Sequence, residues 1–340
     1  MVVRFKEARF YEKIHDNIIH CFLCNQHCKI SESNRGLCGV RENVNGILYS
    51  LVYDKPVSEA VDPIEKKPLF HFLPGSNSYS IATVGCNFSC FNCQNYDITQ
   101  YPKPKKSIIS NEVSPEEIVE KAKMHKCQSI AYTYTEPTIF FEYAYDIAKI
   151  ANKEGIKNVF VTNGYITEDA LKTISPFLDA ANIDLKSFSD SFYQKICGAH
   201  LKPVLDSIRL HKEFNIWIEL TTLLIPSLND SEKDLKQIAE FIEELDEGIP
   251  WHISRFNPTY KLANLSPTSI ETLKKARKIG SDIGLKHIYL GNVPGEEENT
   301  YCHNCENLLI KRYSYKIIEN NIKDSECPYC NSRIEGIWEI

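Results

Sequence analysis

The sequence predicts an α/β fold in which parallel strands alternate with helices to form a partial or full (βα) barrel. Strand-like and helix-like segments alternate from residue 76 to residue 291, which is typical of parallel sheets with crossover helices. Eleven of the thirteen cysteines fall into three tight sets, one inside this region and one on each side of it. We therefore expect an N-terminal extension with a four-cysteine metal site at 1–75, the barrel at 76–295, and a zinc ribbon-like module at 296–340.

Composition narrows the class of protein before any motif is considered. With 43% hydrophobic and 25% charged residues the chain has the make-up of a globular protein and not of a disordered one. Its net charge of -6 disfavours general binding to nucleic acid or anionic lipid. No apolar run approaches the ~18 residues that a membrane helix needs, so we expect a cytoplasmic protein. In that reducing compartment, thirteen cysteines indicate metal or cluster binding and not disulfides.

The barrel elements follow in order from a strand that ends in a glycine turn. Alternating or continuous apolar residues predict strands at 76–85, 128–134, 158–162, 181–185, 216–224, 251–256 and 286–291. Helical periodicity predicts helices at 114–125, 138–153, from about 167, from about 202, at 231–245 and at about 267–283. Ser114 and Glu117 form a capping-box pattern at the first of these helices. Reaction centres of such barrels lie at the carboxyl ends of the strands.

The middle cysteine set is the one that indicates catalysis. Cys86, Cys90 and Cys93 have C-x3-C-x2-C spacing and directly follow the first barrel strand. Three thiolates on a cubane cluster leave one iron to take an outside ligand, which is where substrate chemistry can occur. The alternative is an ordinary four-cysteine site that Cys127 or Cys197 would complete, although both are more simply explained as packing residues.

Each terminal set has four cysteines, enough to close a tetrahedral shell. The C-terminal set has two C-x2-C pairs separated by a gap, a pattern typical of a zinc ribbon: Cys302, Cys305, Cys327 and Cys330. The N-terminal set is less regular and fits either zinc or an auxiliary iron–sulfur cluster: Cys21, Cys24, Cys28 and Cys38.

Polar residues recur where the predicted strands end. They share one expected rim with the middle cysteines: Glu136, Asn163, Asp184, Lys186 and His252. Any one of them alone is more simply a helix cap or a solvated loop residue. Their common register favours a single site.

The motif GCNFSCFNCQN at the end of the first barrel strand resembles that of the radical S-adenosylmethionine enzymes, and more closely that of the pyruvate formate-lyase activating enzyme group. Further segments along nearly the whole chain resemble the AmmeMemoRadiSam system radical SAM enzymes: CFLCNQHC, GLCGVREN, LVYDKPVSEAVDPIEKKPLFHFLPGS, TYTEPTIFFEY, VTNGY, NIDLKSFSDSFY, TTLLIPSLNDS, WHISRFNP and GNVPG. This resemblance implies a radical SAM (βα) barrel with a 4Fe-4S cluster and S-adenosylmethionine as cofactors.

The resemblance also implies roles for individual residues. Cys86, Cys90 and Cys93 would be the cluster ligands, and reductive cleavage of S-adenosylmethionine would yield a 5'-deoxyadenosyl radical that abstracts hydrogen from a substrate. Glu136 would accept a hydrogen bond from the methionine ammonium. The ribose and methionine carboxylate would contact Asn163, Asp184 and Lys186. Ile225 and His252 would flank the adenine and ribose.

Two departures from the family pattern stand beside these implications. The residue before the third cysteine is Asn92 where the family has an aromatic residue, and the aromatic ring is one place earlier, at Phe91. Tyr134 and Thr135 replace the two glycines that precede the family's glutamate. Neither departure touches a cluster ligand.

Substrate and partners are predicted only by class. An unidentified small-molecule or protein substrate is favoured over a glycyl-radical enzyme, because simple activases lack the terminal cysteine modules. The resemblance implies an electron donor of the ferredoxin or flavodoxin type. A metal-stabilised module that binds protein or RNA is the alternative of another class. Residues 300–340 contain five Lys or Arg and six Asp or Glu, a formal charge of -1 that disfavours nucleic acid.

Overall fold

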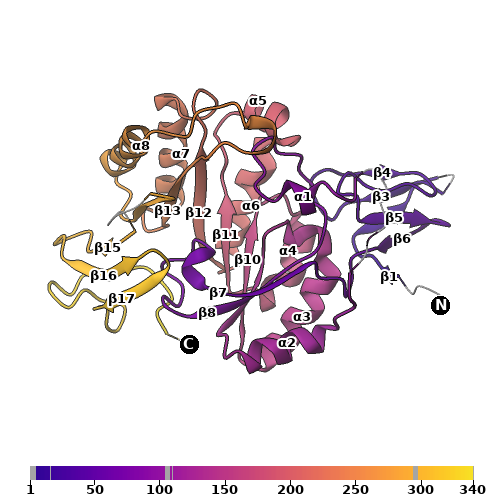
Figure 1. The fold of residues 1–340 in the computed structure, drawn as a ribbon, viewed down its shortest axis with the longest axis horizontal. Helices are drawn as coiled ribbons and strands as arrows, with labels where there is room; N and C mark the ends of the chain where they lie inside the picture. Colours follow the sequence, from indigo (N-terminus) through magenta and orange to yellow (C-terminus); the bar gives the residue numbers. More distant parts are fainter. Residues whose placement is uncertain (1–4, 16, 104–107, 109, 294–297, 340) are drawn as a thin grey trace.

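The computed structural model describes residues 5–15, 17–103, 108, 110–293 and 298–339. Its centre is an eight-stranded sheet with the order β14-β13-β12-β11-β10-β9-β8-β7. Strands β8 to β14 pair in parallel with their sequence neighbours, and β7 pairs with β8 in the antiparallel direction. The sheet curves as a partial barrel, which confirms the predicted fold class (Figure 1).

The predicted strands and helices are confirmed to within a few residues. The strands of the central sheet are β7 (Ser58–Pro63), β8 (Asn77–Ala82), β9 (Ser129–Tyr132), β10 (Lys157–Thr162), β11 (Ala180–Asp184), β12 (Trp217–Leu224), β13 (Trp251–Arg255) and β14 (Ile288–Gly291). The helices are α1 (Tyr96–Thr99), α2 (Pro115–Met124), α3 (Phe141–Lys153), α4 (Glu168–Ile174), α5 (Asp190–Phe192), α6 (Leu201–Glu213), α7 (Glu232–Leu245) and α8 (Ile270–Ile283).

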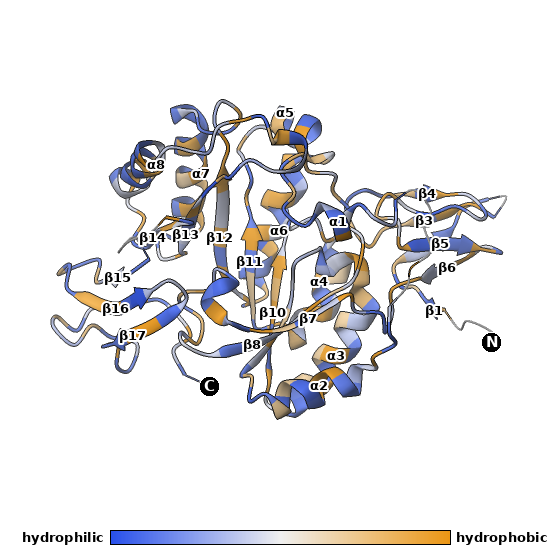
Figure 2. Cartoon of the chain, in the orientation of Figure 1, coloured by the Kyte–Doolittle hydropathy of each residue, from blue (hydrophilic) through white to orange (hydrophobic). Residues whose placement is uncertain are grey.

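The helices cover the outside of the curved sheet because parallel strands need crossover connections, and these return over one face. Helix α2 begins at the predicted capping box, where Ser114 and Glu117 each bond the other's backbone N–H. The middle strands β10 and β11 are coloured largely hydrophobic, as expected for strands buried on both faces (Figure 2). Most of the core therefore lies between this sheet and its helices.

Two small antiparallel sheets form the N-terminal extension, which lies at one end of the molecule (Figure 1). One sheet has the order β1-β6-β5 and the other β2-β3-β4. Their strands are β1 (Lys6–Glu7), β2 (Tyr11–Lys13), β3 (Ile19–Cys21), β4 (Lys29–Ile30), β5 (Arg41–Val44) and β6 (Ile47–Ser50). Buried Arg41 ties the extension to α3 through an ion pair of 2.7 Å with Glu142.

A third antiparallel sheet forms the C-terminal ribbon at the opposite end of the molecule (Figure 1). Its strands are β15 (Thr300–Tyr301), β16 (Leu308–Tyr313) and β17 (Lys316–Asn320). Buried Arg312 reaches the barrel, where it donates to the Phe70 carbonyl oxygen at 2.9 Å and lies 4.4 Å from the centre of the Phe70 ring.

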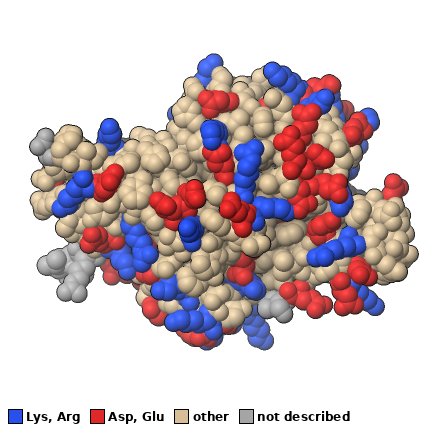
Figure 3. Space-filling model, turned by 180° about the vertical axis from the view of Figure 1, so that it is seen from behind, with Lys and Arg blue, Asp and Glu red and all other residues tan. Residues whose placement is uncertain are grey.

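Surface charge is mixed in sign on the face shown in Figure 3, where Lys and Arg alternate with Asp and Glu. This distribution agrees with the nearly balanced charge of the sequence. Among the described residues no helix combines the length and the apolar character that crossing a membrane requires.

Candidate active site

The loop that carries the middle cysteines begins just beyond β8 and is held from two sides. On one side, the backbone N–H groups of Ser89 and Phe91 donate to carbonyl oxygens of the π-helical turn Tyr193–Cys197, at 2.9 and 3.0 Å. On the other side, Gly85 has φ +102°, and a Cβ there would lie 2.9 Å from the Cys38 carbonyl oxygen. A side chain at residue 85 would therefore push the loop off the N-terminal extension.

The three cysteines of this loop are partly buried residues. Buried Cys197 lies beside Cys90, and this neighbour holds the pKa of the Cys90 thiol below its ordinary value although burial opposes the shift. Burial raises the pKa of Cys86 well above its ordinary value. The sequence analysis explains Cys197 most simply as a packing residue and leaves open that it faces the active site, and the fold places it beside Cys90.

Glu136 follows β9 and is held rigidly in the interior. Its side chain is 1% exposed and accepts hydrogen bonds from Thr138 Oγ1 at 2.6 Å and from Thr162 Oγ1 at 2.7 Å. The backbone N–H groups of Thr138 and Asn163 also donate to it. Burial raises the pKa of Glu136, and these hydrogen bonds oppose that rise. The carboxylate therefore has a fixed direction at the rim.

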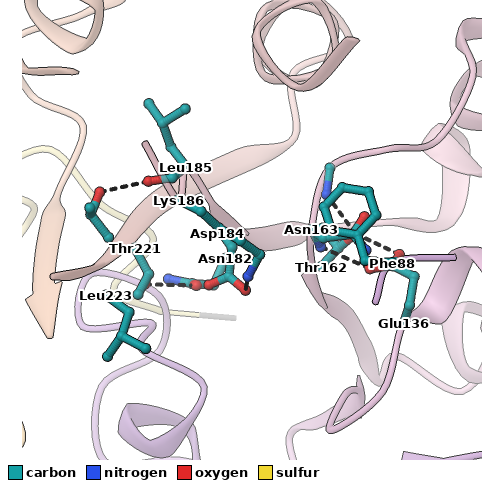
Figure 4. Close-up of polar contacts among 12 residues, drawn as sticks. Phe88, Glu136, Thr162, Asn163, Asn182, Asp184, Leu185, Lys186, Thr221 and Leu223 are labelled. Carbon is teal, nitrogen blue, oxygen red and sulfur yellow. Dashed lines mark hydrogen bonds and ion pairs between the residues drawn. The ribbon is translucent and has the colours of Figure 1, made fainter. Parts of the chain in front are cut away.

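Asn163 links Glu136 to the cysteine loop. Its backbone N–H donates to Glu136 Oε2 at 2.8 Å, and its side-chain Nδ2 donates to Asn87 Oδ1 at 2.7 Å. Figure 4 shows Asn163 and Thr162 grouped with Glu136 beside Phe88, a residue of the cysteine loop. Three strands thus contribute to one hydrogen-bonded rim, as the common register of these residues predicts.

Asp184 and Lys186 form a second polar group at the end of β11, separate from Glu136 in Figure 4. Lys186 Nζ lies 2.6 Å from Asp184 Oδ2. Burial alone would lower the pKa of Lys186, but the Asp184 carboxylate and the nearby thiols hold it well above its ordinary value. Asn229 donates to the Lys186 carbonyl oxygen at 2.6 Å and accepts from the Ile225 N–H at 2.6 Å. Buried Ile225 therefore lies near this pair, connected by a residue that sequence reasoning missed.

The prediction that His252 lies at the carboxyl end of its strand is wrong. His252 is the second residue of β13 and is buried. Its Nε2 lies 2.7 Å from Glu219 Oε2, and its ring packs edge-on against Phe70. Glu219 is near the start of β12 and accepts backbone N–H groups of Phe70 and His71. The histidine thus belongs to the interior near the other end of the barrel.

The Tyr134 departure keeps the backbone conformation that a glycine would favour. Tyr134 has φ +61°, in the left-handed region that is costly for a residue with a side chain. Its hydroxyl donates to Asp62 of β7, Lys67 Nζ lies 4.6 Å from its ring centre, and Asn95 Nδ2 donates to its carbonyl oxygen at 2.7 Å. These contacts compensate for the strain. At the other departure, Lys261 Nζ lies 4.6 Å from the centre of the Phe91 ring.

The two terminal cysteine sets lie in different surroundings. The sulfurs of the ribbon converge, all within 4.8 Å of one another: Cys302, Cys305, Cys327 and Cys330. The N-terminal cysteines line one cavity together with Asn87 of the loop that carries the middle cysteines: Cys21, Cys24, Cys28 and Cys38. The sequence grouped each set correctly but did not place either one relative to the barrel.

Comparison with known proteins identifies the family. The model described as the radical SAM superfamily matches residues 80–242, which span β9 to β12 and the cysteine loop. An uncharacterized protein of Methanocaldococcus jannaschii is 49% identical over 334 residues, which cover 97% of this chain and 99% of that protein. The chain belongs to the radical SAM superfamily. Members of this superfamily are enzymes that use a 4Fe-4S cluster and S-adenosylmethionine.

Two further likenesses fit this membership. The pyruvate formate-lyase-activating enzyme of Staphylococcus epidermidis is 21% identical over 216 residues, which cover 58% of this chain and 86% of that enzyme. The structure of SuiB from Streptococcus suis bound to S-adenosylmethionine superposes with a TM-score of 0.50 at 12% identity, and the match covers 67% of this chain and 53% of SuiB. The second likeness concerns the fold alone. The AmmeMemoRadiSam grouping stays a prediction.

Proposed function

We propose that this radical SAM protein holds its catalytic 4Fe-4S cluster on Cys86, Cys90 and Cys93 and acts on an unidentified small-molecule or protein substrate. The observation that supports the proposal is the placement of three cysteines on one loop beside the rim, where the charge of Glu136 acts on Cys86 and the Asp184–Lys186 pair acts on Cys90. Three thiolates are the donor set that a cluster with one substrate-binding iron requires.

When bound, the reduced cluster and S-adenosylmethionine supply a 5'-deoxyadenosyl radical that abstracts hydrogen from the substrate. The protein's part is to bind and orient. Glu136, fixed by hydroxyl and amide donors, presents a carboxylate to the methionine ammonium. Lys186 offers a positive charge to the methionine carboxylate, and Asn163 offers its amide to the ribose. Ile225 provides an apolar wall for the adenine, and His252 is left out of the proposed site because of its position in β13.

The terminal modules complete the proposal. In the ribbon, Sγ–Sγ distances of 3.6 Å join Cys302 to Cys330 and Cys305 to Cys327. A tetrahedral zinc with bonds of ~2.3 Å places its thiolates ~3.8 Å apart, so zinc fits these four sulfurs. We propose that the ribbon is a structural zinc module and that the units 1–75, 76–295 and 296–340 have separate tasks, with the first unit also contributing β7 to the central sheet. An electron donor of the ferredoxin or flavodoxin type would reduce the cluster.

A second candidate function is activation of a glycyl-radical enzyme, in which the substrate hydrogen belongs to a protein backbone glycine. The likeness to the pyruvate formate-lyase-activating enzyme favours it. The two terminal cysteine modules favour the first candidate, because simple activases lack them. Together these modules are about as long as a small domain. Incubation with candidate glycyl-radical enzymes and detection of a protein-based radical separates the two.

The chemistry is tested by anaerobic reconstitution with iron and sulfide, reduction, addition of S-adenosylmethionine and chromatography of 5'-deoxyadenosine. Wild-type protein and the matched variant Cys127→Ala, which changes a buried cysteine outside the three sets, are expected to yield product, whereas Cys93→Ala is not. Cys197→Ala is expected to keep its iron, because the proposal gives the cluster three protein ligands. Equal product from wild type and Cys93→Ala, or loss of iron in Cys197→Ala, would contradict it.

A further inference from the structure

The N-terminal cysteines surround a single cavity in the core side of the extension. Two of them, Cys21 and Cys38, are buried, and the other two are partly exposed. The rest of the lining is largely apolar and includes Leu23, Ile30 and Ile139. Four thiols that face one apolar cavity form a soft donor set, which selects zinc, copper(I) or an iron–sulfur cluster over hard cations.

Sulfur spacing separates a single ion from a cluster. In the ribbon, all four sulfurs lie within 4.8 Å of one another. Among the N-terminal cysteines, all of which the structure describes, no three sulfurs meet that condition, and the same holds for the Cys86, Cys90 and Cys93 set. One zinc ion would require all its thiolates ~3.8 Å apart. Thiolates bound to different irons of a cluster are spread more widely.

Two buried hydrogen-bond donors in the same cavity lack an acceptor. Arg41 Nε and Asn87 Nδ2 both belong to residues that line the cavity and are at most 3% exposed, and neither atom has a partner among the described residues. Buried donors are nearly always paired. Cluster sulfides and cysteine thiolates accept N–H groups, and such hydrogen bonds tune cluster potentials. The cavity thus presents both the thiols and the unpaired donors that an electron-rich sulfur group needs.

We propose that Cys21, Cys24, Cys28 and Cys38 hold a second iron–sulfur cluster, placed against the back of the catalytic loop. Gln26 Nε2 donates to the Asn87 carbonyl oxygen at 2.9 Å, and the Cys38 carbonyl faces Gly85, the residue before Cys86. Asn87 therefore faces the N-terminal cavity while its neighbour Cys86 belongs to the catalytic set.

This position suits a one-electron relay, a role that rests on the proposed function. A reduced ferredoxin or flavodoxin would give one electron to the N-terminal cluster, and that cluster would give one electron to the catalytic cluster. The donor is oxidised by one electron, the catalytic cluster is reduced by one, and no bond or proton changes at the N-terminal site. The N-terminal cluster ends each transfer in its starting oxidation state.

Metal and sulfide analysis of the full chain tests the site without reference to catalysis. After anaerobic reconstitution, the triple variant C86A/C90A/C93A is expected to retain about half of the wild-type iron and sulfide if both clusters are of the 4Fe-4S type. Further substitution of Cys24→Ala and Cys28→Ala should remove the remainder, whereas adding Cys127→Ala to the triple variant should not. A triple variant without iron, or a wild type with two zinc ions per chain, would overturn the proposal.

Spectroscopy of the wild-type protein tests the second cluster without any variant, so a variant that fails to fold cannot affect the result. Mössbauer and low-temperature electron paramagnetic resonance spectra of reduced wild type should contain two cluster components, only one of which changes when S-adenosylmethionine is added. A single component that accounts for all the iron would refute the second site. If iron analysis and spectra support two clusters but no 5'-deoxyadenosine forms, the proposed function fails and the site stands.

The relay has a test of its own. For Cys24→Ala, the ratio of 5'-deoxyadenosine formed with reduced flavodoxin to that formed with dithionite should fall at least about tenfold relative to wild type, because small reductants can reach the catalytic cluster directly. An unchanged ratio would refute the relay.

Discussion

The two terminal cysteine sets offer the same four thiols in opposite settings. In the ribbon, two C-x2-C turns bring the sulfurs together within 4.8 Å, far from the rim of the barrel. In the extension, the sulfurs line a cavity that shares Asn87 with the catalytic loop. The type and number of donors therefore do not determine which metal group a site binds. The spacing that the backbone imposes on the sulfurs determines it.

The two modules also differ in how they are fastened to the barrel. Arg41 of the extension meets the Glu142 carboxylate, and both side chains are at most 2% exposed. Arg312 of the ribbon has carbonyl oxygens, the Thr300 hydroxyl and the Phe70 ring as partners. A buried carboxylate left without its arginine is costly, whereas carbonyls and a ring lose less. The extension should therefore be the more strongly coupled of the two.

The largest expected effect is at the Arg41–Glu142 pair. Arg41→Ala should lower the free energy of unfolding by about 3–5 kcal/mol, because it leaves Glu142 buried and unpaired. Urea denaturation measures the change, and exposed Arg209→Ala is the matched control. The double variant Arg41→Ala/Glu142→Ala should be less destabilised than the sum of the single variants. A loss as small as that of Arg209→Ala would mean that the extension is only loosely coupled.

A smaller effect is expected at Arg312. Arg312→Ala removes hydrogen bonds of a charged group, each worth about 1.5–3 kcal/mol, and the direct partners of these bonds are neutral oxygens and not a carboxylate. Hydrogen exchange should accelerate in β15–β17 and leave the central sheet unchanged. Lys311→Ala, on the exposed side of the same strand, is the control. Equal acceleration in the central sheet would show that both modules are coupled to the barrel alike.

The smallest effect is a pH dependence confined to the ribbon side. Burial raises the pKa of Glu298 to about 6, although nearby Arg312 opposes the rise. An unfolded glutamate has a pKa of about 4.3, so between these values the folded state binds more protons, and stability falls as pH rises. Wild type should lose stability relative to Glu298→Gln over this range in urea denaturation. Parallel curves for the two proteins would show that Glu298 has no raised pKa.

Sequence reasoning succeeded where a local pattern decides the structure. The parallel strands and the helices that separate them follow from apolar runs and caps such as Ser114 with Glu117. It missed β7, because the segment Ser58–Pro63 contains two carboxylates and a proline and does not look like a sheet strand. An antiparallel edge position tolerates such residues.

The errors at the site concern the position of a residue along its strand and the contacts between residues that are distant in the sequence. His252 is the second residue of β13 and also of the strand predicted at 251–256, so the predicted strand itself already places it at the amino end and not at the carboxyl end. Register with β12 places it opposite Thr221 and within reach of Glu219. In the same way, the contact between Cys90 and Cys197 and the support of Tyr134 by Asp62 join residues far apart in the chain.

Residues 71–73 at the base of the barrel pair with a segment made much later. The N–H of Leu73 donates to the Ile337 carbonyl oxygen, and the N–H of Ile337 donates to the His71 carbonyl oxygen, both at 2.7 Å. His71 Nδ1 also meets the carbonyl of Glu335, 264 positions along the chain. At about 5–20 residues per second, a ribosome needs roughly 13–53 s to make that interval. The backbone hydrogen bonds at residues 71–73 therefore cannot form during synthesis until the ribosome has made residue 337.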